Sequence, residues 1–213
     1  KTLERFAGTK SFSNLAKELG HDVFTSDFDP QFDTDYCVDI MKFDPSKVPF
    51  KPDIIWASPP CTTFSVASIG HHWNPDKTPK TAEARLGIAI LEKTIEIISH
   101  FKPKYFYIEN PRGMMRNLMR DDLFTPISQD VLMWRRNTVT YCKYGEKRMK
   151  PTDIWTNDLN WKPKLPCKNG DPCHESAPRG ARTGTQGIKG ARDRSRVPRQ
   201  LCLEILNTLK NKI

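Results

Sequence analysis

Long hydrophobic runs are missing from this sequence. No apolar stretch approaches the length of about 18 residues that marks a membrane-spanning helix. The first ten residues, KTLERFAGTK, also lack the apolar core of a signal peptide. We therefore expect no membrane association and a cytoplasmic protein.

Internal repeats and low-complexity segments are absent too, and cysteine is sparse. The six cysteines lie far apart except Cys167 and Cys173. Without an export signal we expect reduced thiols rather than disulfides. Acidic residues are the minority charge, with 25 Asp and Glu against 34 Lys and Arg and a formal net charge of +9. This excess favours a polyanionic partner, nucleic acid first.

Strand-like and helix-like segments alternate over the first half of the 213 residues. Extended segments are expected at 3–7, 22–26, 36–40, 54–57 and 104–108, and helices at 12–19 and 81–100. This alternation predicts parallel βαβ units in a doubly wound, mostly parallel α/β sheet. Ligands bind at the carboxyl ends of the strands in such sheets. Residues able to carry chemistry fall just beyond the expected strand ends: Gly8, Asp27, Asp39, Cys61 and Glu109.

The second half of the chain is less regular. A helix at 112–119 and a hairpin with strands at 138–144 and 153–156 are expected, followed by a basic, irregular region rich in Gly and Pro at 157–194. A closing helix at 197–209 carries an apolar stripe with Pro198 at its first turn. The stripe consists of Leu201, Ile205 and Leu209. We expect three parts: a core (1–156), a recognition region (157–194) and a C-terminal helix packing back on the core (195–213).

Cys61 stands in the stretch SPPCTTFS, directly after the buried strand expected at 54–57. Pro59 and Pro60 fix two φ angles immediately before it. A cysteine held by a stiff backbone at a strand end suits a nucleophile. The alternative is a buried thiol that acts as a small hydrophobe.

Motifs along nearly the whole chain resemble those of cytosine-C5 DNA methyltransferases. PPCTTFS is similar to the nucleophile loop, and Glu109-Asn110-Pro111 to the family's Glu-Asn-Val signature. FAG at residues 6–8 resembles the first cofactor loop, although Thr9-Lys10-Ser11 replaces the usual glycine pair. Residues 144–150 resemble a shortened Gln-x-Arg-x-Arg segment, and 195–198 the Asn-Ala-Val-Pro start of the last helix. The chain resembles a small phage or bacterial member with a reduced recognition region.

The resemblance implies S-adenosylmethionine as cofactor. Asp27 would accept hydrogen bonds from the ribose hydroxyls, Phe28 would pack on the adenine, and Asp39 with Ile40 would read the adenine edge. The implied cofactor-binding residues are Phe6, Ala7, Gly8, Asp27, Phe28, Asp39, Ile40, Pro59 and Ile90.

The resemblance also implies covalent catalysis on a flipped-out cytosine of double-stranded DNA. Cys61 would attack carbon 6, Glu109 would hold N3, and Arg148 would stabilise charge at O2. The implied substrate-binding residues are Ser65, Asn110, Lys150, Arg182 and Arg192. The enzyme would act as a monomer in a bacterial or phage-infected cell. Residues 157–194 are too few for a substantial independent recognition domain, so we expect a short or relaxed recognition sequence.

Three other hypotheses remain open at this point. The same chemistry could act on RNA, the less favoured substrate. The chain could be a nucleic-acid-binding module on an inactive methyltransferase frame, in view of the altered first loop. A modified methionine-derived donor could replace the usual cofactor.

His71 and His72 are interpreted as surface residues of a polar loop.

Cys167, Cys173 and His174 form a C-x5-C-H pattern. This spacing is longer than that of usual zinc knuckles, and a fourth ligand would have to come from elsewhere, with Cys142 the nearest choice. We expect a tight Gly/Pro turn without metal, with a zinc site as the alternative.

Overall fold

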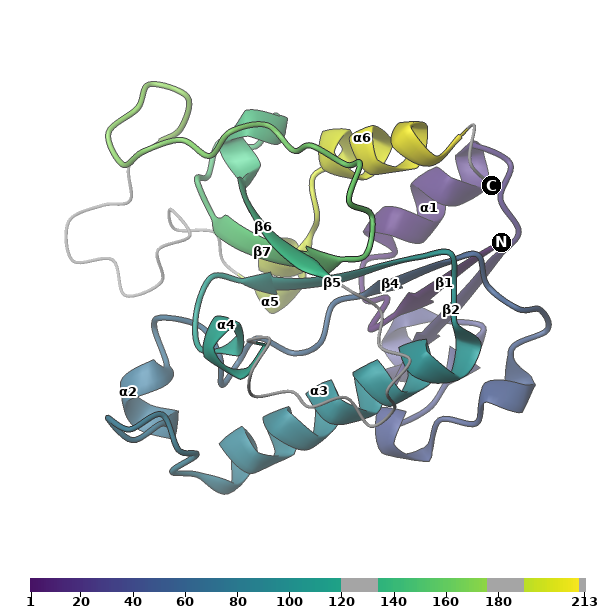
Figure 1. Cartoon of the computed structure of the whole chain (residues 1–213), viewed down its shortest axis with the longest axis horizontal. Coiled ribbons are helices and arrows are strands. Elements are labelled where there is room, and N and C mark those ends of the chain that lie inside the picture. Colours follow the sequence, from purple (N-terminus) through teal and green to yellow (C-terminus); the bar gives the residue numbers. More distant parts are fainter. Residues whose placement is uncertain (120–133, 176–189, 211–213) are drawn as a thin grey trace.

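The computed structural model describes residues 1–119, 134–175 and 190–210. Its centre is a seven-stranded sheet in the order β3-β2-β1-β4-β5-β7-β6 (Figure 1). The strands are β1 (Thr2–Arg5), β2 (Val23–Asp27), β3 (Tyr36–Cys37), β4 (Ile54–Ala57), β5 (Tyr105–Pro111), β6 (Arg135–Thr140) and β7 (Pro151–Thr156). Strands β1 to β5 pair in parallel, and β6 and β7 are antiparallel. The expected doubly wound, mostly parallel α/β sheet is confirmed.

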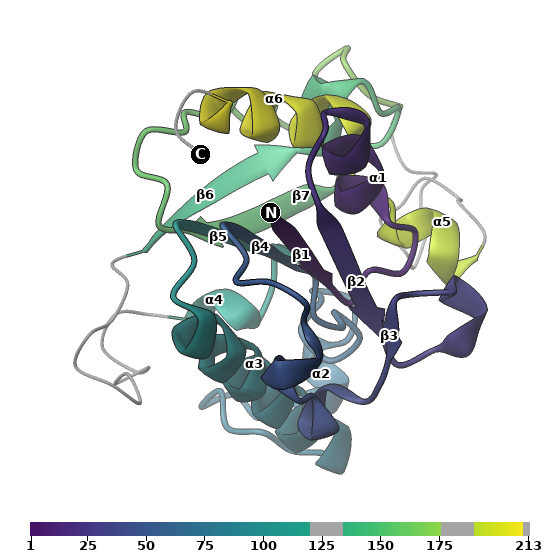
Figure 2. The ribbon, with the colours of Figure 1, turned by 90° about the vertical axis from the view of Figure 1, so that its right-hand side faces the viewer.

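Helices cover both faces of the sheet. α1 (Ser11–Glu18) and α6 (Arg199–Leu209) lie side by side on one face, and α3 (Ala82–Phe101) lies on the other with α4 (Met115–Leu118), as Figure 2 shows. Two shorter helices complete the set: α2 (Ile69–His72) and α5 (Ala191–Ser195). Covering both faces explains why the central strand β4 reads as a continuous apolar run.

Strand β4 illustrates how the two cores form. Ile55 packs in the core on the α3 side, whereas Ile54 and Trp56 pack in the core beneath α1 and α6. Successive side chains of a strand point to opposite faces, so one short apolar run supplies both cores. The Trp56 ring stacks on Phe12 of α1 at a centroid distance of 4.7 Å.

The two long helices follow their sequence patterns. The Thr81 hydroxyl caps α3 by accepting a hydrogen bond from the Ala84 N–H (3.2 Å). Residues 84, 88, 91, 95 and 98 recur at helical spacing and form an apolar face of α3, on which Ala84, Leu91 and Ile98 are buried and the other two are half-buried. The expected stripe of α6 is buried in full. Periodicity therefore predicted both helices and the sides that they bury.

The structure differs from the sequence analysis in several boundaries. β5 continues to Pro111 because Glu109, Asn110 and Pro111 pair with β7, although the pairing of β5 with β4 ends at Ile108. Glu109 thus lies within a strand yet beyond the end of the neighbouring β4. Residues 141–144 form a 3₁₀ turn rather than the end of a strand, and α5 interrupts the region expected to be irregular.

Candidate active site

The loop after β4 carries Cys61 in a tight turn. The Cys61 carbonyl accepts hydrogen bonds from the N–H groups of Phe64 (3.1 Å) and Ser65 (3.0 Å). On the other side of Cys61, the Asn110 side-chain amide donates to the Pro59 carbonyl (2.8 Å). Asn110 is completely buried. Its hydrogen bond to Pro59 therefore connects the Cys61 loop to β5.

Two glycines let neighbouring elements approach this loop closely. A Cβ on Gly113 would lie 2.0 Å from the Phe64 carbonyl oxygen, which itself accepts the Met114 N–H (2.7 Å). A Cβ on Gly87 in α3 would lie 2.7 Å from the Thr63 hydroxyl. No side chain fits at the Gly113 position without backbone movement, so the loop is fixed from two sides by close packing.

Glu109 reaches the same place from β5. Its side chain is buried, and its carboxylate accepts a hydrogen bond from the Tyr141 hydroxyl (3.0 Å). The Lys150 ammonium lies 3.9 Å from the same carboxylate oxygen and 4.7 Å from the centre of the Tyr141 ring. A carboxylate, a phenol and an ammonium group therefore meet at the edge of the sheet where Cys61 lies.

The surroundings set the protonation of Cys61. Burial raises the pKa of its thiol most, the Glu109 carboxylate raises it further, and the positive charges of Lys150 and Arg194 lower it. Burial lowers the pKa of Lys150, which the Glu109 charge opposes. Charges of both signs thus act on the Cys61 thiol: Glu109 disfavours the thiolate, and Lys150 and Arg194 favour it.

Arg148 lies next to Tyr141, with its guanidinium carbon 5.4 Å from the centre of the Tyr141 ring. Its side chain is buried, and its guanidinium donates to the backbone carbonyls of Arg194 (3.0 Å) and Arg196 (2.9 Å). Its Nε lies 3.5 Å from a Glu146 carboxylate oxygen. Arg148 therefore holds the α5 segment against the hairpin, and Lys150 is the cation beside Glu109.

Asp27 organises the first loop at the end of β2. Its carboxylate accepts hydrogen bonds from the Gly8 N–H (3.0 Å) and the Asp29 N–H (3.1 Å). The loop turns sharply, with positive φ at Phe6 (54°), Gly8 (43°) and Lys10 (53°). Lys10 thus adopts a left-handed conformation that glycine would take with less strain.

The remaining candidate cofactor residues border this loop. Phe28 is 67 % exposed beside Asp27, which is unusual for so large an apolar side chain. Asp39 is exposed and accepts the Met41 N–H (3.0 Å), and Ile40 is buried behind it. An exposed aromatic ring that directly follows the Asp27 carboxylate fits a ligand that carries a flat ring and hydroxyl groups. Three other residues provide apolar surroundings: Ala7 and Pro59 are buried, and Ile90 is half-buried.

Three further residues were predicted to bind the substrate: Ser65, Arg182 and Arg192. The Ser65 hydroxyl lies 3.0 Å from the Ser68 hydroxyl, next to the Cys61 turn. Arg192 is exposed and lies over the Phe32 ring (6.0 Å), next to the turn after β2 rather than beside Glu109. Arg182 lies outside the described residues.

His72 is buried, contrary to the expectation of a surface residue. Its Nδ1 lies 2.8 Å from the hydroxyl of Thr81, the residue that caps α3. His71 is exposed, as expected.

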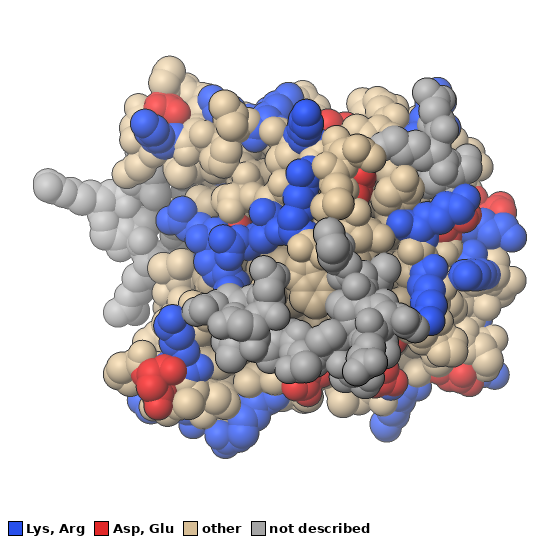
Figure 3. All heavy atoms as spheres, viewed as in Figure 1, with Lys and Arg blue, Asp and Glu red and all other residues tan. Residues whose placement is uncertain are grey.

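Positive charge gathers on one face of the molecule. Lys and Arg form a band across the middle of the face shown in Figure 3. Within the described residues, no helix is both long and apolar enough to cross a membrane.

Comparison with known proteins agrees with this geometry. The model of a family described as "C-5 cytosine-specific DNA methylase" matches residues 4–128. A Frog virus 3 (isolate Goorha) protein named "Probable DNA (cytosine-5)-methyltransferase" is 31% identical over 227 aligned residues, which cover 97% of this chain and 99% of the relative. This chain belongs to the C-5 cytosine-specific DNA methylase family. The resemblance inferred from the motifs is thereby confirmed, and this family and fold imply S-adenosylmethionine as the cofactor.

Solved structures support the fold of this methylase. A prophage-encoded E. coli protein, described as a "putative DNA modification methyltransferase", has a TM-score of 0.55 at 17% identity, and the match covers 99% of this chain and 68% of that one. A mutant of Spodoptera frugiperda DNMT2 has a TM-score of 0.50 at 20% identity and covers 76% of this chain. The methylase spans about half the length of that second protein (52%).

The sequence analysis missed several residues of the candidate site. No sequence pattern pointed to Tyr141, because its hydrogen-bond partner Glu109 is 32 positions away. For Gly113 the sequence offered one weak indication, a glycine shortly after the Glu-Asn-Pro motif. Glu4 was missed as well: from β1, its carboxylate accepts the N–H groups of Phe12 (3.4 Å) and Ser13 (2.8 Å) and caps α1, and burial raises its pKa to about 7.

Proposed function

We propose that this methylase transfers a methyl group to carbon 5 of a flipped-out cytosine in double-stranded DNA through a covalent bond to Cys61. One observation carries the proposal: Cys61, Glu109 and Lys150 converge at the carboxyl edge of β4 and β5. The positive net charge supports a polyanionic substrate. The viral relative, named as a DNA methyltransferase, supports DNA.

Cys61 is the nucleophile of this scheme. Its thiolate adds to carbon 6 of cytosine, so a sulfur–carbon bond forms and the electron pair of the carbon 5–carbon 6 double bond moves to carbon 5 and into the ring. Carbon 5 becomes nucleophilic only through this addition. Loss of the carbon 5 proton after methylation restores the double bond and releases the Cys61 thiolate.

Glu109 and Lys150 stabilise the negative charge that develops on the cytosine ring during this addition. A protonated Glu109 carboxyl donates to N3 and neutralises the negative charge that develops on the ring. Protonation also removes the carboxylate charge that raises the pKa of Cys61. A proton on Glu109 thus favours both the thiolate and its product. Lys150, which lies beside Glu109, stabilises charge at the base in the role first expected of Arg148.

The loops after β1, β2 and β3 would hold the cofactor. Asp27 would accept from its ribose hydroxyls, the exposed ring of Phe28 would stack on adenine, and Asp39 would accept from the adenine edge. Bound S-adenosylmethionine supplies an electrophilic methyl group. The exposed Phe28 ring is the structural feature that fits this ligand best.

Positioning and recognition fall to the remaining residues. Asn110 braces the Cys61 loop through the Pro59 carbonyl, and Ser65 borders it. We assign residues 1–156 to the catalytic core, 157–194 to DNA contact and 195–213 to a helix that closes the core. Arg182 and Arg192 would contact phosphates. Recognition through so short a region would be of a short or relaxed site.

Covalent trapping tests the proposal. A duplex oligonucleotide containing 5-fluorocytosine, which cannot lose its carbon 5 substituent as a proton, should give a stable adduct with the wild-type chain and S-adenosylmethionine. Cys61→Ser should give none, and Cys37→Ser, a matched change at an exposed cysteine, should react as the wild type does.

Substrate class and sequence context are read from the same assay. Adducts in many sequence contexts would support relaxed recognition, and strict dependence on a long site would refute it. An adduct with RNA in preference to matched DNA would refute the DNA assignment. No adduct in the folded wild type, or an adduct that persists in Cys61→Ser, would refute the mechanism.

A further inference from the structure

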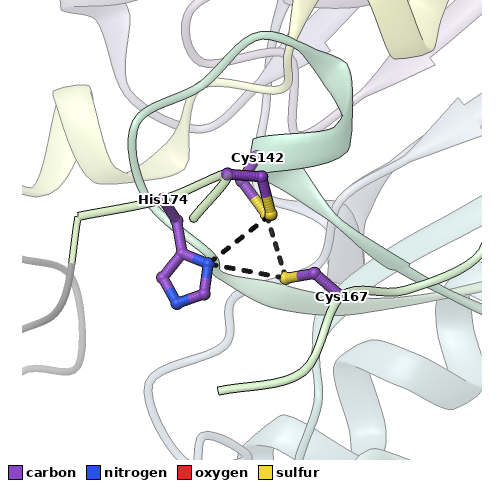
Figure 4. Close-up of side chains that lie close together, drawn as sticks. Cys142, Cys167 and His174 are labelled. Carbon is purple, nitrogen blue, oxygen red and sulfur yellow. Dashed lines mark hydrogen bonds between the residues drawn. The ribbon is translucent and has the colours of Figure 1, made fainter. Parts of the chain in front are cut away.

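Three cysteines and a histidine meet at one side of the β6–β7 hairpin. Cys142 belongs to the 3₁₀ turn after β6, and Cys167, Cys173 and His174 come from the segment after β7. One ligand atom from each of the four lies within 4.8 Å of every other. Figure 4 shows the side chains of Cys142, Cys167 and His174 pointing toward one another.

The distances within this Cys–His cluster suit a tetrahedral metal. Cys173 Sγ is 3.7 Å from Cys142 Sγ and 3.7 Å from His174 Nδ1, and Cys167 Sγ is 3.7 Å from the same nitrogen. Ligands of tetrahedral zinc lie about 3.8 Å apart for two sulfurs and about 3.6 Å apart for sulfur and nitrogen, given the usual bond lengths. The Cys142–Cys167 sulfur distance of 3.1 Å is shorter than this value and far longer than a disulfide bond of about 2.05 Å.

Backbone contacts fix both arms of the cluster. The Cys167 N–H donates to the Thr140 hydroxyl (3.0 Å), directly before the turn that carries Cys142. The Lys168 N–H donates to the Asp171 carboxylate (2.8 Å), and Gly170 has a φ of +91°, so the chain folds back between Cys167 and Cys173. The long C-x5-C spacing is therefore closed by a tight turn.

The chain is held again on the far side of the cluster. The Glu175 N–H donates to the Lys147 carbonyl (2.9 Å) in the β6–β7 connection. Cys142 and Cys167 are buried, whereas Cys173 and His174 are half-buried. Cys142 and Cys167 are thus shielded from water, whereas an ion can reach the cluster from the side of Cys173 and His174.

We propose that Cys142, Cys167, Cys173 and His174 bind one zinc ion as a structural Cys₃His site. Four protein ligands leave no open position for a substrate, which is the arrangement of structural rather than catalytic zinc. The ion replaces the thiol protons of the three cysteines and binds the neutral imidazole through Nδ1. The zinc alternative of the sequence analysis is preferred over the expected metal-free turn because the structure supplies Cys142 as the fourth ligand.

The site would join two segments that the catalytic edge depends on. Cys142 lies eight positions before Lys150, in the connection that also carries Arg148. The residue after His174, Glu175, donates its backbone N–H to the Lys147 carbonyl in that connection. Zinc would therefore hold the β6–β7 connection, and with it the cation beside Glu109, in a single arrangement.

Metal analysis of the intact chain tests this proposal without any activity measurement. We expect about one zinc ion per wild-type chain after purification without chelators. Cys142→Ser and Cys173→Ser should lose the zinc, whereas Cys37→Ser should retain it. Less than a tenth of an ion in folded wild type after incubation with zinc, or full zinc in Cys173→Ser, would overturn the proposal.

Cobalt gives a second readout that separates lost binding from lost folding. Wild-type chain loaded with Co²⁺ should show the intense visible absorption of tetrahedral cobalt and a sulfur-to-metal charge-transfer band. His174→Cys should keep the metal with a shifted spectrum, and His174→Ala should bind far more weakly. A Cys142–Cys167 disulfide in the purified chain, with no cobalt spectrum after reduction, would refute the site.

Discussion

The Cys61 loop and the Cys–His cluster place the same side chain in opposite surroundings. Cys61 stands alone at a strand end, with a carboxylate and an ammonium group acting on its thiol. The cluster gathers three thiols and an imidazole whose ligand atoms lie within 4.8 Å of one another. The difference teaches that neighbours, rather than the cysteine itself, decide between a nucleophile and a ligand.

The two regions also differ in how they are held. Close backbone packing at Gly113 and the Asn110 amide hold the Cys61 loop. The segments of the cluster are tied by a few hydrogen bonds between irregular stretches. Irregular chain of this kind gains much from a metal, whereas a loop packed on a parallel sheet needs none.

The largest expected effect is that of removing the proposed zinc, which acts on the Cys–His cluster and not directly on the Cys61 loop. A chelator that strips the proposed zinc should lower the melting temperature of the wild type by roughly 10 °C or more, because the segments of the cluster lose their cross-link. Calorimetry with and without chelator measures the shift. Cys173→Ser should start from the lower value and be insensitive to chelator. A wild-type melting temperature unchanged by complete zinc removal would show that the cluster is held without metal.

Arg116 and Asp153 connect the chain after β5 with the hairpin. The Arg116 guanidinium donates twice to the Asp153 carboxylate, each at 2.7 Å, and Asp153 is completely buried. Arg116→Met would leave that charge buried without its cation, which should cost about 3 kcal/mol in the free energy of unfolding.

Urea denaturation of this variant measures the cost, with Lys93→Met as control. Lys93 pairs with Glu96 on an exposed part of α3, and its loss should change stability by less than about 0.5 kcal/mol. Equal effects of the two variants would contradict a connecting role for Arg116.

Gly113→Ala should damage the Cys61 loop and spare the cluster. The new methyl group would overlap the Phe64 carbonyl, so the loop must shift, at a cost of about 2 kcal/mol. Methyl transfer should fall while zinc content stays unchanged. Gly70→Ala, at a helical glycine with open space around it, is the matched control in urea denaturation and activity assays. Normal activity in Gly113→Ala would mean that the loop tolerates the shift.

Lys150→Met should give the smallest of these effects, measured here as a change in the reactivity of Cys61. The Lys150 charge lowers the pKa of the Cys61 thiol, so its removal raises that pKa and reduces the thiolate fraction at a given pH. Alkylation of Cys61 by iodoacetamide at pH 8 should slow roughly threefold to tenfold. Glu109→Gln should act in the opposite direction, because it removes a charge that raises the pKa.

Peptide mass spectrometry follows Cys61 separately from the other cysteines. In the wild type, burial raises the thiol pKa, so the rate should continue to increase above the pH at which free cysteine levels off. Changes of the same sign in Lys150→Met and Glu109→Gln would show that packing, not charge, governs this thiol.

The sequence by itself determined the fold class and the strand-end residues. Alternating apolar segments predicted the parallel half of the sheet, since β4 reads as a continuous apolar run only when both faces are covered. Asp27 and Cys61 stand at or just beyond the ends of their strands, and Glu109 lies past the end of β4. The order of segments along the chain was enough to predict that these residues share an edge, because parallel strands place their carboxyl ends at the same edge of a sheet.

Only the tertiary structure decided which distant groups complete each region. Lys150 lies beside Glu109, and both Lys150 and Arg148 donate to the Arg194 carbonyl of the α5 segment. Cys142 and Cys167 are 25 positions apart, and they lie side by side because β7 and the segment after it return the chain to the end of β6. Periodicity and motif spacing act over a few residues, whereas these contacts depend on how separate elements pack.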